Sequence, residues 1–557
     1  MGGGLLQIVA YGFQDIYLTN NPQITFFKTV YRRHTNFSIE AHEKTFNDNP
    51  NFGQFGKVKL YRLGDLATKM FLRIKIDSVE TEKGVKFAWI RRLGHAMIRR
   101  VEIEIGGIII DRHYGTWLDI WYELARSGKH DLGYAKMIGD VNELTSYNDN
   151  CKPEYVLYIP LQFWFNRHYG LALPLIAIQY HEIFIRVEFE KKEKLIVRSK
   201  QFNNLDCIKI LEVGLVTDYI YLDIEERKRF ATIGHEYLIE QVQTDDDISV
   251  IEQVKRLTLT FNHSTKEIIW VLRNGNYIVG KNFLCYTNKD DWCQEISECS
   301  RKILKQSMVL IKGPPPDCGK WEEFPPGANN IFSSNCNYEV TNKSKHHSLW
   351  INLNSLCINN YSITEKISAT IVVKQNNKIV IKKLATTLNE KDISIPVEDM
   401  NDTRFGVCDD VYVYQFSNYG LYITGRGNPL TFAMLEYNDY NRVDKKNGKF
   451  FGVLQPYLHH SNTPKDGINL YSFALEPEKH QPTGVSNLSK IENIILTLWF
   501  NKNKCENQYE HENTNPNLNQ CNNFFDPNNI NNRLFIFAFS YNIFRVISGL
   551  TGLSYNG

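Results

Sequence analysis

One stretch of the chain has the spacing of a phosphate-binding loop. Residues 275–282 read GNYIVGKN, which matches G-x-x-x-x-G-K and follows the strand-like sequence IIWVL. Such a loop wraps backbone amides around phosphate and needs a Ser or Thr hydroxyl after the lysine for Mg²⁺. Here Asn282 takes that place, and a Tyr-Ile-Val middle lacks the freedom of glycine. We interpret the stretch as a turn between strands. Gly313–Lys320 matches the phosphate-binding pattern less well, because it is rich in proline and its glycines are one residue too far apart.

Histidine pairs are the best candidates for metal ligands. They occur at His346-His347 and His459-His460, but adjacent residues of a strand point to opposite faces, so neither pair can hold one ion from one wall. His181-Glu182 and His235-Glu236 lack the second histidine that H-E-x-x-H requires. There is no G-x-S-x-G sequence for a nucleophilic serine. The sequence therefore predicts no catalytic residue, no metal and no cofactor, and so a protein that is not an enzyme.

A basic and aromatic cluster near the N-terminus could bind single-stranded nucleic acid by stacking and phosphate contacts. It consists of Phe26, Phe27, Lys28, Tyr31, Arg32, Arg33 and His34. The whole chain, however, has 64 Lys and Arg against 62 Asp and Glu, and a net charge of +2 gives no field to hold a polyanion. We therefore expect no direct nucleic-acid binding and interpret the cluster as polar edge residues on a half-buried strand.

The cysteines and the hydropathy pattern predict a soluble protein made in the cytoplasm. Eleven cysteines without a C-x-x-C pair fit reduced thiols better than disulfides or zinc. We find no signal peptide and no run of about eighteen apolar residues. Leu6 stands where N-myristoylation needs Ser or Thr. Without a secretory signal, ordinary glycosylation is not expected at the Asn-x-Ser/Thr triplets, which begin at Asn36, Asn262, Asn342, Asn360, Asn401 and Asn487.

Composition and hydrophobic periodicity predict large β domains. Of the 557 residues, 43% are hydrophobic and 13% aromatic, enough for two sizeable cores rich in strands. The clearest strand is 183–189, where Ile183, Ile185 and Val187 alternate with charged residues after the buried run Leu171–Ile178. Similar alternation recurs at 70–77, 101–105, 257–261, 367–373, 411–413, 494–498 and 534–538.

Turns and one helix complete this pattern. Gly106-Gly107 and Asn376-Asn377 offer two-residue hairpin turns, and residues 115–125 place apolar side chains at helical spacing. Strands separated by turns in two units of similar size suggest two all-β sandwiches of jelly-roll type.

We predict the following division of the chain. Residues 1–24 form an N-terminal arm, 25–222 the first jelly roll, 223–236 a charged linker and 237–557 the second jelly roll. The arm is too short and too broken by Gly12 and Pro22 to form a core of its own. The second jelly roll is expected to carry loop insertions near 286–348, which is rich in proline, and 501–532, which is dominated by asparagine.

Four segments of the chain resemble the major capsid proteins of the nucleocytoplasmic large DNA viruses, of phycodnavirus, mimivirus and iridovirus type. They are residues 2–40, FWFNRHYGLALPLIAIQYHEIFI at 163–185, 448–498, and YNIFRVISGLTGLSYNG at 541–557. Phe13 departs from the family, which usually has alanine there, and the two insertions match it poorly.

The resemblance implies a structural role. It implies an all-β fold of two consecutive eight-stranded antiparallel jelly rolls (a double jelly roll) with short helices and long loops. It also implies a homotrimer that forms a pseudo-hexagonal capsomer, and an icosahedral shell over an inner membrane that the chain does not span. Minor capsid and penton proteins would be its partners, and it would be a late viral protein assembled in host cytoplasm and located in the virion. A carbohydrate-binding or cupin-like double β-sandwich protein is the alternative, which a sugar or metal in a concave pocket would reveal.

Overall fold

The computed structural model describes residues 3–273, 428–500 and 532–555, with breaks at 11, 30, 82–84, 86, 127, 129, 146–150 and 199–207. Between 274 and 427 it describes Tyr286 and the backbone of strands β14–β20. The interpretations made above for residues 275–282, 313–320, 346–347, 376–377 and almost all of 501–532 lie outside the described residues.

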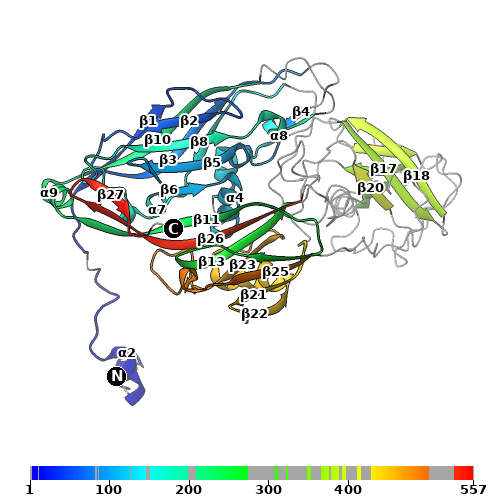
Figure 1. Cartoon of the computed structure of the whole chain (residues 1–557). Helices are drawn as coiled ribbons and strands as arrows, with labels where there is room; N and C mark the ends of the chain where they lie inside the picture. Colours follow the sequence, from blue (N-terminus) through cyan, green and yellow to red (C-terminus); the bar gives the residue numbers. More distant parts are fainter. Residues whose placement is uncertain are drawn as a thin grey trace.

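Eight strands between Phe37 and Leu222 form the first jelly roll (Figure 1). Two four-stranded antiparallel sheets pack face to face, and in each sheet strands distant in the sequence are neighbours. One sheet has the order β1 (Phe37–Thr45), β10 (Ile210–Leu222), β3 (Leu66–Ile76), β7 (Tyr155–Pro160). The other has the order β2 (Phe55–Lys59), β8 (Ile183–Phe189), β5 (Ile98–Ile105), β6 (Ile108–His113).

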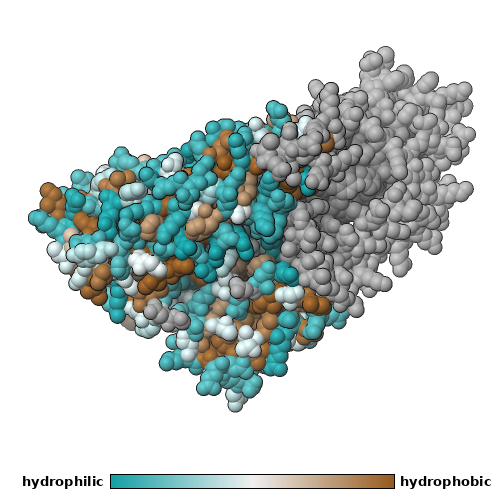
Figure 2. Space-filling view, turned by 45° about the horizontal axis from the view of Figure 1, so that its top comes forward, coloured by the Kyte–Doolittle hydropathy of each residue, from teal (hydrophilic) through white to brown (hydrophobic). Residues whose placement is uncertain are grey.

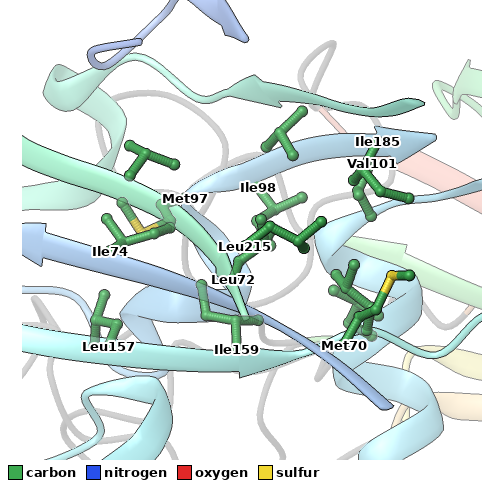
Figure 3. Packing of buried hydrophobic residues seen from close by; sticks show 14 of the residues in the cluster. Met70, Leu72, Ile74, Met97, Ile98, Val101, Leu157, Ile159, Ile185 and Leu215 are labelled. Carbon is green, nitrogen blue, oxygen red and sulfur yellow. The ribbon is translucent and has the colours of Figure 1, made fainter. Parts of the chain in front are cut away.

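Alternating residues explain why these strands form a sandwich. In β3, Met70, Leu72 and Ile74 are buried, whereas the residues between them are only partly buried. Figure 3 shows them packed against Leu157 and Ile159 of β7 and facing residues of the opposite sheet. Gly106 and Gly107 form the turn from β5 to β6 with φ of 60° and 85°, values that glycine adopts without strain. The predicted hairpin is therefore present.

The second jelly roll repeats the same strand order. One sheet is β11 (His235–Ser249), β26 (Arg533–Ile547), β13 (Ser264–Arg273), β23 (Ile468–Ser472), to which β24 (Ser486–Asn487) and β27 (Leu550–Leu553) add. The other is β12 (Val254–Thr258), β25 (Ile494–Phe500), β21 (Leu430–Tyr437), β22 (Tyr440–Asn447). The predicted fold class of two eight-stranded jelly rolls is confirmed.

Helices and extra strands fill the connections. Helices α4 (Gly115–Ala125), α5 (Asp131–Ile138) and α6 (Asn142–Thr145) join β6 to β7, and α9 (Ile224–Thr232) joins the two jelly rolls. The corresponding β22-to-β23 connection contains η7 (Phe450–Leu454), a π-helical turn, and α11 (Gln455–His459). The β13-to-β21 connection contains β14 (Met308–Ile311), β15 (Glu322–Glu323), β16 (Ser348–Asn352), β17 (Lys366–Gln375), β18 (Lys378–Thr387), β19 (Asp392–Pro396) and β20 (Val411–Gln415).

The N-terminal segment extends away from the sandwich (Figure 1). Its helices α1 (Gly3–Val9) and α2 (Ile16–Thr19) contain no buried residue. The first strand begins only at Phe37, so the basic and aromatic residues at 26–34 are exposed and precede any strand. Their interpretation as edge residues of a half-buried strand is wrong. The described residues of this segment form no strand and pair with none of the described strands.

Candidate assembly surfaces

Helix α4 belongs to the first jelly roll but packs on the second, above the sheet that contains β13 and β26 (Figure 1). Its residues Trp117, Ile120, Trp121 and Leu124, at the spacing predicted from the sequence, are all buried. They contact the outer face of that sheet through Val242, Ile269, Val271, Ile468, Leu470, Phe537 and Phe539. The junction between the jelly rolls is therefore apolar and built like a domain core.

The opposite side of α4 carries a buried ionic cluster. Asp119 and Glu123, one helical turn apart, both bind the guanidinium of Arg92, a residue in the left-handed conformation with φ of 53°. His95 Nδ1 lies 3.6 Å from Asp119. Burial alone would raise the pKa of Asp119, but the charge of Arg92 outweighs it and lowers the pKa to about 2. The carboxylate therefore stays charged and holds the helix in place.

A second ionic cluster joins the two jelly rolls directly. Arg167, just before the buried run that precedes β8, lies 2.7 Å from Glu240 of β11. Glu240 also binds Lys266 of β13, whose side chain is fully buried. Burial lowers the pKa of Lys266, and the carboxylate of Glu240 opposes that effect. These pairs offset the cost of placing charges in the junction.

His459 and His460 point to different partners, as adjacent residues should. His459 Nδ1 lies 3.0 Å from the carbonyl oxygen of Leu475. His460 is enclosed, with Nε2 2.8 Å from Glu267 and Nδ1 2.9 Å from Glu478. Burial disfavours its charge, but the two carboxylates prevail and raise its pKa to about 9. His460 therefore acts as a buried cation that ties α11 to the sheet.

The other histidines predicted as weak metal candidates also make structural contacts. His181 Nδ1 accepts a hydrogen bond from the backbone N–H of Thr551 at 3.1 Å and so joins the first jelly roll to β27. His235 Nε2 lies 2.8 Å from the carbonyl oxygen of Phe230. Glu182 and Glu236 pair with Lys59 and Arg545. Among the described residues, no group of three or more His, Cys, Asp or Glu side chains could hold a metal ion.

A groove of about 530 Å³ lies where the jelly rolls meet. Its lining includes Trp164, Arg167 and His168 on one side and Glu240, Glu478 and His480 on the other. Charges of both signs line it, and the ion pairs described above occupy most of them. Cys151 is an exposed free thiol, and the other cysteines lie outside the described residues. Within the ranges that the structure describes, none of the helices has the length and hydrophobicity to cross a bilayer.

Several large apolar side chains lie exposed together in the N-terminal segment and on the helical segment of the second jelly roll. In the N-terminal segment, Phe13, Tyr17, Leu18 and Phe27 are at least 79% exposed. On η7 and α11 the exposed residues are Val453, Leu454, Tyr457 and Leu458. Figure 2 shows hydrophobic patches on one face of a mainly hydrophilic surface. Such patches in a well-packed protein mark interaction sites.

Comparisons with known proteins agree with the resemblance seen in the sequence. A family model described as the N-terminus of the major capsid protein matches residues 25–223. A model described as the large eukaryotic DNA virus major capsid protein matches residues 226–552. The two matched regions contain the first and second jelly rolls.

Relatives and solved structures match over nearly the whole chain. Capsid protein 1 of Acanthamoeba polyphaga mimivirus is 38% identical, with 100% of each chain covered. The major capsid protein of Phaeocystis pouchetii virus is 32% identical over 100% of each chain. A chain of the PBCV-1 virus capsid superposes with a TM-score of 0.61 at 26% identity and covers 96% of this chain and 100% of its own.

These relatives decide between the two predicted classes of protein. They carry the names of capsid proteins, so the prediction of a structural protein rather than an enzyme is confirmed, and nothing in them supports a carbohydrate-binding or cupin-like activity. The place of such proteins is the capsid shell of the virion. The chain belongs to the family of large eukaryotic DNA virus major capsid proteins.

Proposed function

We propose that the protein forms a homotrimer, a pseudo-hexagonal capsomer that tiles the icosahedral shell of a large double-stranded DNA virus. The observation that carries this proposal is the presence of two jelly rolls with the same strand order in one chain, joined by a shared apolar cluster. Three such chains supply six similar units, which can surround one axis as the six edges of a hexagon. The exposed apolar residues supply surface for permanent contacts between copies.

The division of the chain follows from this role. We propose residues 1–24 as an assembly arm, 25–222 and 237–557 as the two jelly rolls, and 223–236 as the linker. The arm would meet minor capsid proteins beneath the shell, and penton proteins would complete the vertices. An inner membrane would lie nearby without being spanned, nucleic acid would not be bound, and assembly would take place in the host cytoplasm.

Light scattering on the purified protein tests the trimer. At micromolar concentration we expect a mass three times the 64.9 kDa of the chain, unchanged on dilution, because permanent interfaces of ~2,000–5,000 Å² do not dissociate there. A well-folded monomer of stable mass would contradict the proposal.

A further inference from the structure

The connections β6-to-β7 and β22-to-β23 are equivalent in the two jelly rolls, and both begin with a helix. In each connection the helical conformation begins at a glycine, Gly115 in α4 and Gly448 two residues before η7, and this glycine touches the backbone at the start of the first strand of the preceding hairpin. A Cβ on Gly115 would clash with the carbonyl oxygens of His95 and Ile98, and a Cβ on Gly448 would clash with that of Leu430. Ile98 begins β5 and Leu430 begins β21, which are equivalent strands. The two helical segments are thus anchored in the same way.

The side chains that follow these glycines are also equivalent. Three residues after each glycine, Leu118 and Phe451 are buried in the core of their own jelly roll. Five and six residues after Gly115, Ile120 and Trp121 face away from that core and pack on the other jelly roll. At the same distances from Gly448 stand Val453 and Leu454.

At these two positions the helical segments differ in burial, and two residues after the glycine Trp117 packs on the other jelly roll whereas Phe450 packs against the core of its own. Ile120 and Trp121 are 0% and 6% exposed, because the second jelly roll covers them. Val453 and Leu454 are both 43% exposed, and one turn later Tyr457 and Leu458 are 74% and 57% exposed. The second helix therefore carries an apolar stripe at i, i+1, i+4 and i+5 that is only partly covered within the chain.

The covered helix shows what kind of surface fits this stripe. Helix α4 lies on the outer face of the sheet β11-β26-β13-β23, on a cross-strand row formed by Phe537, Ile269 and Leu470. The equivalent sheet of the first jelly roll is β1-β10-β3-β7. Its outer face has a comparable row of Val216, Phe71 and Pro160, each partly exposed.

Around that row the outer face of the first sheet carries both partly exposed apolar side chains and charged side chains. Tyr158 and Ile39 are 41% and 45% exposed. Arg73 next to the row is held by Glu43 and Glu212, so its charge is already paired. An apolar helix can cover such a face without leaving a charge unpartnered.

We propose that the helical segment 448–459 of one copy docks on the outer face of the β1-β10-β3-β7 sheet of a second copy, as α4 docks on the second jelly roll within the chain. This inference rests on the proposed trimer and specifies its interface. Three contacts within chains and three between chains then alternate around the ring. In such a ring each α4 and each segment 448–459 packs on a sheet. Each β1-β10-β3-β7 sheet and each β11-β26-β13-β23 sheet is covered by one of these helical segments.

The first test is a double substitution, Leu454→Asp with Leu458→Asp, compared with Ile224→Asp on α9, where Ile224 is 65% exposed. We expect light scattering to give one-third of the wild-type mass for the double variant and the wild-type mass for the control. The circular dichroism spectrum of the double variant should match that of the wild type, because both leucines are partly exposed in the single chain and neither belongs to a buried core. A folded double variant that keeps the trimer mass overturns the proposal and leaves the trimer itself intact.

The second test locates the contact and does not depend on a variant. Trimers are assembled from a mixture of unlabelled and ¹⁵N-labelled chains and treated with a lysine cross-linker. We expect mixed-isotope peptides that join Lys449, next to the stripe, to Lys69 or Lys75 on the outer face of β3. Cross-links of Lys449 only to other surfaces of the second copy would overturn the proposal. A wild-type protein that is monomeric throughout would instead contradict the proposed function.

Discussion

The rings of Trp117 and Phe537 lie with their centroids 5.5 Å apart, although one belongs to a helix of the first jelly roll and the other to a strand of the second. Trp117 is 1% exposed and also lies near Phe539. This contact makes the two jelly rolls share a core, and we expect them to unfold as one unit.

Replacement of Trp117 by alanine tests that coupling. The Trp117→Ala variant should lose about 3–5 kcal/mol of unfolding free energy, because a large buried ring is replaced by a cavity. Denaturant titration followed by fluorescence and by circular dichroism measures the loss. Leu132→Ala, at a side chain 82% exposed, is the control and should change stability by less than about 0.5 kcal/mol. Equal stability of the two variants would show that the junction is not a shared core.

Arg92 should matter more for stability than its surface counterpart. In Arg92→Met, Asp119 and Glu123 would remain buried without the guanidinium that binds both of them, which costs roughly 3–5 kcal/mol. Arg99→Met removes an ion pair with Glu188 from a side chain that is 64% exposed, and we expect a loss below about 1 kcal/mol. Thermal melting at pH 7 compares them. A melting temperature for Arg92→Met within error of Arg99→Met would refute the role of the buried cluster.

His460 should make stability depend on alkaline pH. Its pKa in the folded chain, about 9, is above the ordinary value of 6.5, so the charged form stabilises the fold fully below pH 6.5. That contribution, roughly 3 kcal/mol, is lost as the pH rises through about 9. Denaturant titrations between pH 6 and 9.5 should show this decrease of the unfolding free energy with rising pH in the wild type and in His459→Gln. His460→Gln should not show it. If His460→Gln keeps the full slope, another group is responsible.

The N-terminal segment should serve assembly rather than folding. Deletion of residues 2–20 removes α1 and α2, which contribute no buried residue, so melting and the trimer mass should be unchanged. We expect closed particles to fail to form, since the uncovered apolar side chains are then missing. Leu5→Ser with Leu6→Ser keeps the length and should weaken particle formation in the same direction. Loss of the trimer on deletion would instead place the segment within the folded domain.

Local periodicity predicted the strands of two large β domains, and the resemblance to the capsid protein family supplied the two consecutive eight-stranded jelly rolls. The buried residues alternate with less buried ones in β3 from Thr68 onward and throughout β8, and the apolar spacing of α4 matches its buried face. The clusters at the junction could not be predicted in this way. Arg92 meets Asp119 and Glu123 only because the chain folds back over 27 and 31 residues, and His460 meets Glu267 across 193 residues.

Sequence patterns were also a poor guide to the burial of charge. Glu102 and Glu104 alternate with apolar residues of β5, a pattern typical of a strand with one solvent-exposed face. Both are nevertheless buried, at 3% and 8% exposure, since Arg112, Arg186 and Lys57 from neighbouring strands pair with them. The partners come from other strands, so their positions are set by the sheet order and not by the local sequence.

Electron microscopy of the purified, full-length protein tests the central claim most directly. Averaged images should show particles with three-fold symmetry and a hexagonal outline, in which six jelly rolls surround one axis. Averages that show a single two-lobed chain, or a two-fold dimer, at the concentration where the protein is folded would contradict the account.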